Sequence, residues 1–251
     1  MYYLGLVLIV SSWNIDSRVE VAPLEVAPHW WDRSYRDTRY VISSPLRWDK
    51  GDWCRANLQV CKAKALPYLI LVGATGGLMS QDERIQDWAQ ESRSSTRDKV
   101  ASIFEPLGAE GAVILLAGGY LGGWATGNAG LEKMALLGVE SASISTATVL
   151  SLKFLTGRSR PYTGDDARTY SPFNIHASHQ SFPSGHTAMA FSVASCIAEE
   201  CNNTLISVLS YGTAALVGLS RINDNEHWAS DVFVGSIIGI AIGRAVVKLN
   251  Q

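Results

Sequence analysis

The pattern of apolar and polar positions becomes helical at residue 65 and stays so to the end of the chain. Residues 65–81 and 111–131 carry no charge, and the second run is close to the ~20 residues that a helix needs to cross a bilayer. The intervening residues 82–100 are highly charged, with Ile85, Trp88 and Ala89 at the spacing of one helix face. This middle stretch is therefore predicted to be an amphipathic surface helix.

Further helices are predicted over residues 131–154, 186–200, 202–220 and 231–247. The first of these mixes branched apolar residues with Ser and Thr, which favours packing inside a bundle. The last has glycine every four residues, at Gly235, Gly239 and Gly243, so another helix can approach it closely. Since β-type alternation is essentially absent from the sequence, the predicted fold class is all-α, with a six-helix core bundle.

The N-terminal part has a different character. Residues 1–10 are almost wholly apolar and lack a basic flank, which leaves a secretory signal, a membrane anchor and a buried segment open. Residues 13–53 are rich in Trp, Pro and charge and have no sustained period, which predicts an irregular arm. We therefore divide the chain into an N-terminal segment with its arm, residues 1–64, and a helical bundle domain, residues 65–251.

Composition narrows the class of partner. Lys and Arg total 21 against 23 Asp and Glu, so no broad basic surface favours nucleic acid. A hydrophobic content of 47% leaves integral, peripheral and soluble forms open. The four cysteines lack metal-ligand spacing, and Cys196 and Cys201 would lie about 7 Å apart along a helix, a poor separation for a disulfide. Buried free thiols are expected.

The first chemical block is Lys153-x6-Arg160-Pro161, at the end of the helix over residues 131–154. Seven residues are close to two helical turns, so both cationic side chains would leave on one face if the helix continued. Taken alone, such a pair usually complements the helix dipole and stays solvated.

The second block is Pro183-Ser184-Gly185-His186, a turn that leads into a helix. Ser184 suits the N-cap, and Gly185 allows the backbone to approach a ligand closely. The free N–H groups of the first turn can bind an anion, and His186 would lie beside it.

The third block is Ser220-Arg221-x5-His227-x3-Asp231. His227 and Asp231 would lie on one face if the last helix begins near Glu226. A carboxylate bonded to one imidazole nitrogen leaves the other free as a base or nucleophile. Each block alone has an ordinary structural explanation, but chance does not account for all three in order at helix ends.

The three blocks resemble the signature of the type-2 phosphatidic acid phosphatase and vanadium-dependent haloperoxidase superfamily, with no departure at a motif position. The motifs cover residues 153–231; residues 65–151 fit in helix count only, and the N-terminal arm is not covered. The resemblance implies a six-helix bundle with the site at one end.

The resemblance also implies roles for the residues. His227 would attack phosphorus to form a phosphohistidine, oriented by Asp231, while His186 would protonate the leaving alcohol and then activate water. The phosphate-binding groups would be Lys153, Arg160, Ser184, Gly185 and Arg221. No metal or cofactor is expected, and phosphate or vanadate would occupy the site as product or analogue. His176 and His179 are expected to be solvated loop residues.

The leading hypothesis is a phosphatase for a phosphomonoester or diphosphate, lipid-linked or small. Phosphatidate, phosphatidylglycerophosphate, isoprenyl diphosphates and lipid A phosphates remain open as substrates. The site would face the periplasm or cell exterior from a membrane. A vanadate-dependent haloperoxidase, a soluble periplasmic acid phosphatase and a non-catalytic binding protein are the alternatives.

Overall fold

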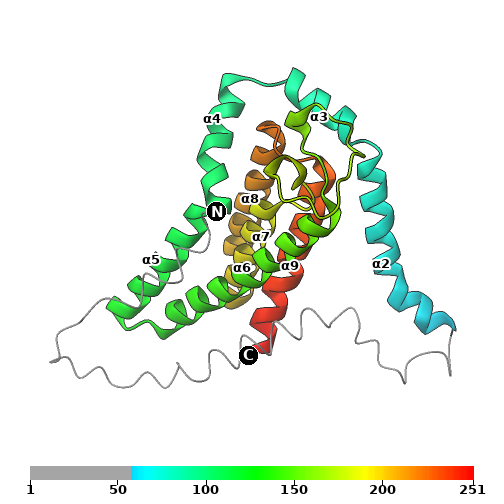
Figure 1. Ribbon diagram of the computed structural model, residues 1–251. Helices are drawn as coiled ribbons and strands as arrows, with labels where there is room; N and C mark the ends of the chain where they lie inside the picture. The colour runs from blue at the N-terminus through cyan, green and yellow to red at the C-terminus, as the bar shows by residue number, and fades with distance from the viewer. Residues whose placement is uncertain (1–57) are drawn as a thin grey trace. The chain divides into compact units, whose positions relative to one another are not determined.

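The computed structural model describes the backbone of residues 58–251 and the side chains of residues 68–251. The apolar N-terminal segment, the arm over residues 13–53 and the side chains of Cys54 and Cys61 lie outside this part. Within it the fold is all-α, as predicted: no strand occurs, and Arg158 and Tyr170 form an isolated bridge. The helices are α2 Leu58–Met79, α3 Asp82–Glu91, α4 Ser95–Phe104, α5 Glu110–Thr126, α6 Ala129–Thr156, α7 Gly185–Cys201, α8 Thr204–Asn223 and α9 Ala229–Leu249 (Figure 1).

The charged stretch that was predicted as one helix forms two, α3 and α4. Ser94 caps α4, with its side chain accepting a hydrogen bond from the backbone N–H of Arg97 at 3.3 Å. The buried face of α3 agrees with the prediction in part. Ala89 is buried as predicted, but Trp88 is 63% exposed, and Asp82 and Gln86 are buried instead. Apolar spacing was misleading for Trp88 because α3 also packs through polar side chains that bond to the rest of the bundle.

Local caps fix the ends of α5 and α6. Gly127, with φ 68°, is the C-cap after α5, and the Asn128 side chain then accepts from the N–H of Leu131 at the start of α6. Gly157, with φ 58°, is the C-cap after α6, and a Cβ there would lie 1.7 Å from the carbonyl oxygen of Ser171. Only glycine fits this turn, because the conformation is left-handed and the neighbouring backbone leaves no room.

The close approach predicted for the last helix is present between α9 and α7. A Cβ at Gly235, Gly239 or Gly243 would lie 2.6, 2.3 or 2.4 Å from a backbone oxygen of α7 or of its N-cap residue. α7 also packs against α6 and α8, which places it in the middle of these four helices (Figure 1). The glycine stripe therefore brings the start of α9 against the start of α7.

Apolar packing below this contact forms the core. One cluster joins α6, α7 and α9 through Leu137, Ile144, Cys196, Ile242, Val246 and Val247. Cys196 is a buried free thiol, as expected, but Cys201 is free and exposed, because it lies at the last residue of α7. The expectation of burial was therefore wrong for Cys201.

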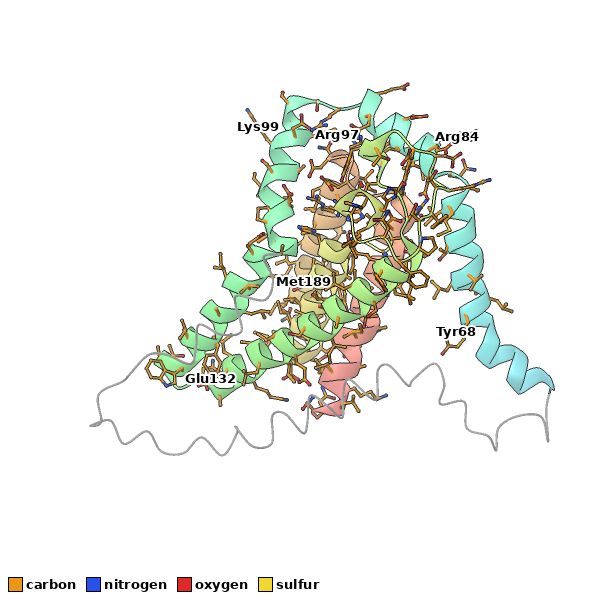
Figure 2. The ribbon with its side chains drawn as sticks, in the orientation of Figure 1. Tyr68, Arg84, Arg97, Lys99, Glu132 and Met189 are labelled. Atoms are coloured by element: carbon orange, nitrogen blue, oxygen red, sulfur yellow. The ribbon has the colours of Figure 1, made fainter. Side chains whose placement is uncertain are left out.

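In the part of the chain that the structure describes, three helices, α6, α8 and α9, are long and apolar enough to cross a membrane. α4 with the 3-10 helix η3 (Glu105–Gly108) and α5 would add a fourth span bent by 55°. Figure 2 places Arg84, Arg97 and Lys99 of α3 and α4 at one end of the bundle and Glu132, at the start of α6, at the other. The length and composition of the helices support a membrane protein.

Candidate active site

The residues singled out from the sequence come together where four helix ends meet. α6 and α8 end there, and α7 and α9 begin there. Lys153 and Arg221 lie in the last turns of α6 and α8, and His186 and Asp231 lie in the first turns of α7 and α9. A hydrogen bond from the backbone N–H of Ser184 to the carbonyl oxygen of Asp231, at 3.0 Å, joins the starts of α7 and α9.

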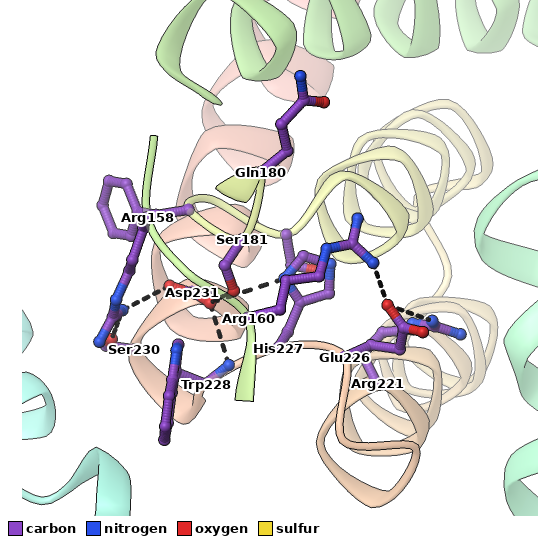
Figure 3. A network of polar contacts seen from close by, with 12 residues as sticks. Arg158, Arg160, Gln180, Ser181, Arg221, Glu226, His227, Trp228, Ser230 and Asp231 are labelled. Atoms are coloured by element: carbon purple, nitrogen blue, oxygen red, sulfur yellow. Dashed lines mark hydrogen bonds and ion pairs between the residues drawn. The ribbon is translucent and has the colours of Figure 1, made fainter. Parts of the chain in front are cut away.

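His227 lies at the centre of this cluster, with 2% of its side chain exposed (Figure 3). Its Nδ1 is 3.6 Å from Oδ2 of Asp231, longer than a normal hydrogen bond. α9 begins at Ala229, so the two residues do not share a helix face as the sequence suggested. His227 instead belongs to the connection after α8, which turns its imidazole toward Asp231 and leaves Nε2 on the other side of the ring.

The surroundings of His227 favour its neutral form. Burial lowers the pKa of His227 well below its ordinary value of 6.5, because the charged imidazolium is poorly solvated. The positive charges of Lys153, Arg160 and Arg221 lower the pKa further. A neutral imidazole has the free lone pair that a nucleophile or base needs.

On one side of His227, Asp231 is bound by several donors. Its carboxylate accepts from Arg158 Nη1 at 2.6 Å, Ser181 Oγ at 2.5 Å and the backbone N–H of Trp228 at 3.0 Å. Arg158 also binds Asp82 and Ser230. We call Asp82, Arg158, Ser230 and Asp231 the support network; all four are 1% exposed or less.

On the other side, two arginines face a pair of carboxylates. Arg160 donates from Nη1 to Glu226, whose Oε2 is also 3.9 Å from Nη2 of Arg221. Arg221 Nη1 bonds Oε1 of Glu105 at 2.5 Å. We call Arg160, Arg221, Glu105 and Glu226 the ligand-facing network. Figure 3 labels Arg160, Arg221 and Glu226 of this set. Glu226 thus lies between two cations, where an oxygen of a bound anion would also be favourable.

Lys153 completes the set of cations. It is buried and donates from Nζ to the Gln180 carbonyl, in the loop that follows α6. A Cβ at Gly185 would lie 3.9 Å from Cε of Lys153, so the first turn of α7 is close to this side chain. The first N–H groups of a helix have no intrahelical partner, and with the lysine they form a favourable place for an anion.

Ser184 differs from its expected role as a side-chain cap. It occupies the N-cap position of α7, but its side chain forms no cap bond, and its Oγ instead accepts from Thr187 at 2.9 Å. Arg160 also departs from the expected geometry, because α6 ends at Thr156 and does not carry it on one face with Lys153. The long loop rather than the helix brings the two cations together.

Four functional candidates were missed by the sequence analysis, namely Asp82, Glu105, Arg158 and Glu226. Arg158 lies inside the first block, but nothing in the sequence distinguishes its role from that of Arg160. In the sequence, Asp82 lies 149 residues before Asp231, and Glu105 lies 122 residues before His227. Their roles therefore depend on long-range packing. Of the loop histidines, His176 is exposed, whereas His179 is half-buried and its Nδ1 lies 3.0 Å from Ser159 Oγ.

Residues 134–251 match the family model described as the PAP2 superfamily. Over this part the chain is similar to that superfamily. The matched region contains all three sequence blocks and every residue for which the sequence suggested a role in the site.

Individual relatives agree with this similarity. A lipid A 1-phosphatase of Porphyromonas gingivalis is 46% identical over 66 residues, which are 26% of this chain and 15% of the relative. The crystal structure of Aquifex aeolicus LpxE superposes with a TM-score of 0.54 at 25% identity, covering 66% of this chain and 94% of that one. The crystal structure of a transmembrane PAP2-type phosphatidylglycerolphosphate phosphatase of Bacillus subtilis superposes with a TM-score of 0.53 at 21% identity. It covers 74% of this chain and 92% of that one.

The similarity to curated relatives is regional. The chain covers 15% to 42% of the length of those it matches. The Bacillus subtilis structure shows a likeness of fold alone. Together with the apolar helices, these comparisons support a PAP2-fold membrane protein.

Proposed function

We propose that this protein is a metal-independent phosphatase that hydrolyses a lipid-linked phosphomonoester or diphosphate through a phosphohistidine. The observation that carries the proposal is the position of His227. Its imidazole is buried, its Nδ1 faces Asp231, and cations lie on its other side. A neutral nucleophile oriented by a carboxylate and facing cations is what attack on a phosphate ester requires.

In the first step, Nε2 of His227 attacks phosphorus and forms an N–P bond while the bond to the leaving oxygen breaks. Burial and then the charge of Arg221 lower the pKa of His186 to about 4, so His186 takes up a proton as the anionic substrate binds beside it. It gives this proton to the leaving oxygen, so the alcohol leaves uncharged. In the second step, His186 takes a proton from water, the water oxygen attacks phosphorus, and the N–P bond breaks. Inorganic phosphate then leaves and the starting protonation state returns.

Throughout both steps the non-bridging oxygens need positive partners, because negative charge remains on them in the transition state. We assign this role to the cationic side chains, the serine hydroxyl and the N–H of the first turn of α7. These groups are Lys153, Arg160, Arg221, Ser184 and Gly185.

A lipid substrate is supported by the apolar helices and by the names of the relatives, which act on lipid A or phosphatidylglycerolphosphate. Phosphatidate, phosphatidylglycerophosphate, isoprenyl diphosphates and the lipid A phosphates are the candidate substrates. We further propose that the site faces the periplasm or cell exterior.

The decisive experiment measures phosphate release by the detergent-purified protein from these lipids and from p-nitrophenyl phosphate, with EDTA present. We expect turnover in EDTA, and an acid-labile, alkali-stable protein-bound phosphate when ³²P-labelled substrate is quenched early. His227→Asn should lower turnover by roughly 10⁴-fold or more and abolish the labelled intermediate.

His176→Asn is the matched control, since it makes the same change in an exposed loop histidine. It should keep both activity and labelling. Normal turnover by His227→Asn would refute the nucleophile. Activity that requires a divalent cation would refute the metal-independent mechanism, and peroxide-dependent bromide oxidation with vanadate would favour a haloperoxidase.

A further inference from the structure

Arg158 is almost fully enclosed by protein atoms and uses all three side-chain nitrogens within the fold. Nη1 donates to Asp231 Oδ1 at 2.6 Å and to Ser230 Oγ at 2.8 Å. Nη2 donates to Asp82 Oδ2 at 2.7 Å, and Nε donates to the Ala167 carbonyl at 2.8 Å. With 1% of its surface exposed, this guanidinium is not placed to bind a substrate phosphate directly.

Asp82 fixes the same region from α3. Its Oδ1 accepts from the backbone N–H of Ser230 at 2.9 Å, and its Oδ2 accepts from Ser230 Oγ at 2.5 Å. Ser230 lies in the first turn of α9, where free N–H groups favour a carboxylate. Asp82 therefore ties α3 to the turn of α9 that carries Asp231.

The buried charge of Asp231 requires a cationic partner such as Arg158. Asp231 is fully buried, and a buried carboxylate stays ionised only when a positive partner and hydrogen bonds replace its water. Among residues 68–251, Arg158 is the only Arg or Lys that forms an ion pair with Asp231. Asp82 in turn balances part of the charge of Arg158 and holds its planar side chain in one orientation.

We propose that Arg158, held by Asp82, is a positioning residue for the reaction. It keeps Asp231 ionised and in place, and Asp231 keeps the imidazole of His227 protonated at Nδ1 and free at Nε2. The inference rests on the proposed function. It adds a connection from Asp82 on α3 to the nucleophile, and Asp82 lies outside all three sequence blocks.

The test compares Arg158→Gln, Arg158→Lys and Asp82→Asn with the unchanged protein. Arg158→Gln should lower kcat by about 10- to 100-fold while KM and inhibition by vanadate stay unchanged, because the ligand-facing cations remain. The acid limb of the kcat profile should move to higher pH. Without its cation Asp231 takes up a proton more readily, so the active form is lost at a higher pH.

The two other variants separate charge from geometry. Arg158→Lys keeps the charge but not the fork of donors, so it should recover part of kcat. Asp82→Asn should lower kcat by a smaller factor, again without a change in vanadate inhibition. Arg168→Gln, an exposed arginine of the same loop, is the control and should behave as the unchanged protein.

A second measurement works without turnover. The ¹⁵N chemical shifts of His227, assigned by their loss in His227→Asn, report which ring nitrogen carries the proton. We expect an Nδ1–H imidazole in the unchanged protein and a mixture of tautomers in Arg158→Gln. If this variant does not fold, Arg158→Lys and Asp82→Asn provide the same readouts.

Three results would overturn the inference. The first is an unchanged kcat, pH profile and tautomer in variants that are merely less stable to heat. The second is weaker vanadate inhibition, which would make Arg158 a ligand-binding residue, and the third is an Nε2–H tautomer in the unchanged protein. Failure of the proposed function looks different, since the unchanged protein would then release no phosphate while the tautomer result still decides the role of Arg158.

Discussion

The support network and the ligand-facing network both pair guanidinium groups with carboxylates, but they differ in access to water. Asp82, Arg158 and Asp231 are at most 1% exposed, whereas the side chains of Glu226 and Glu105 are 28% and 43% exposed. A buried pair cannot separate without leaving an uncompensated charge. A pair that reaches water can exchange one partner, because the displaced carboxylate is rehydrated. The first network is therefore suited to hold Asp231 beside His227, the proposed nucleophile, and the second to exchange a carboxylate for a phosphate.

The largest expected effect in this comparison follows from changing Arg160, which lies two residues from Arg158 but in the other network. Arg160→Gln should lower kcat/KM on the order of 10²-fold and weaken vanadate inhibition, because a cation that contacts the transition state is lost. Steady-state kinetics with vanadate titration measure both. Arg168→Gln serves again as the control. Unchanged vanadate inhibition would mean that Arg160 supports the site without touching the ligand.

A smaller effect, of opposite sign, is expected for Glu226→Gln. The carboxylate competes with a phosphate for Arg160 and Arg221, so removing its charge should lower KM by about 2- to 5-fold, the range of a partly exposed ion pair. Glu199→Gln removes a carboxylate from an exposed pair with Arg244 on α7 and α9 and should leave KM unchanged. A higher KM in Glu226→Gln would show that Glu226 orients Arg160 instead of occupying the place of the ligand.

The last prediction concerns the protonation of His227 and is tested by its pKa instead of by a reaction rate. Because burial and nearby cations lower its pKa, His227 should be neutral at pH 6.5 in the empty site and take up a proton only at lower pH. Bound vanadate neutralises part of that positive charge and should raise the pKa. A pH titration of the His227 ¹⁵N shifts, with and without vanadate, measures both values. An unchanged pKa would place the anion away from the ligand-facing network.

Much of the fold could be predicted because helix periodicity and caps are local. Helices α6 to α9 begin and end close to their expected residues, and the glycine stripe of α9 approaches α7 as its spacing indicated. The error at α3 has a physical reason: apolar spacing pointed to Trp88, but the helix packs through Asp82 and Gln86. Gln86 bonds the Ile222 carbonyl and the Asn225 side chain, so burial here follows polar partners that only the fold supplies.

The residues proposed for the chemistry could also be predicted, because the three blocks are short and each lies at a helix end. Their geometry could not. His227 precedes α9 instead of lying on it, and Ser184 uses its hydroxyl to accept from Thr187. Both positions depend on how the loops pack against neighbouring helices.

The sequence by itself determined an all-α bundle and the set of cations, histidines and carboxylate for its site, since these follow from periodicity and local motifs. Only the tertiary structure decided that Arg158 pairs with Asp231 while Arg160 pairs with Glu226. Two arginines separated by one residue have the same local chemistry. The burial of Arg158 beside Asp82 and the partial exposure of Arg160 beside Glu226 set them apart, and burial is a property of the folded chain.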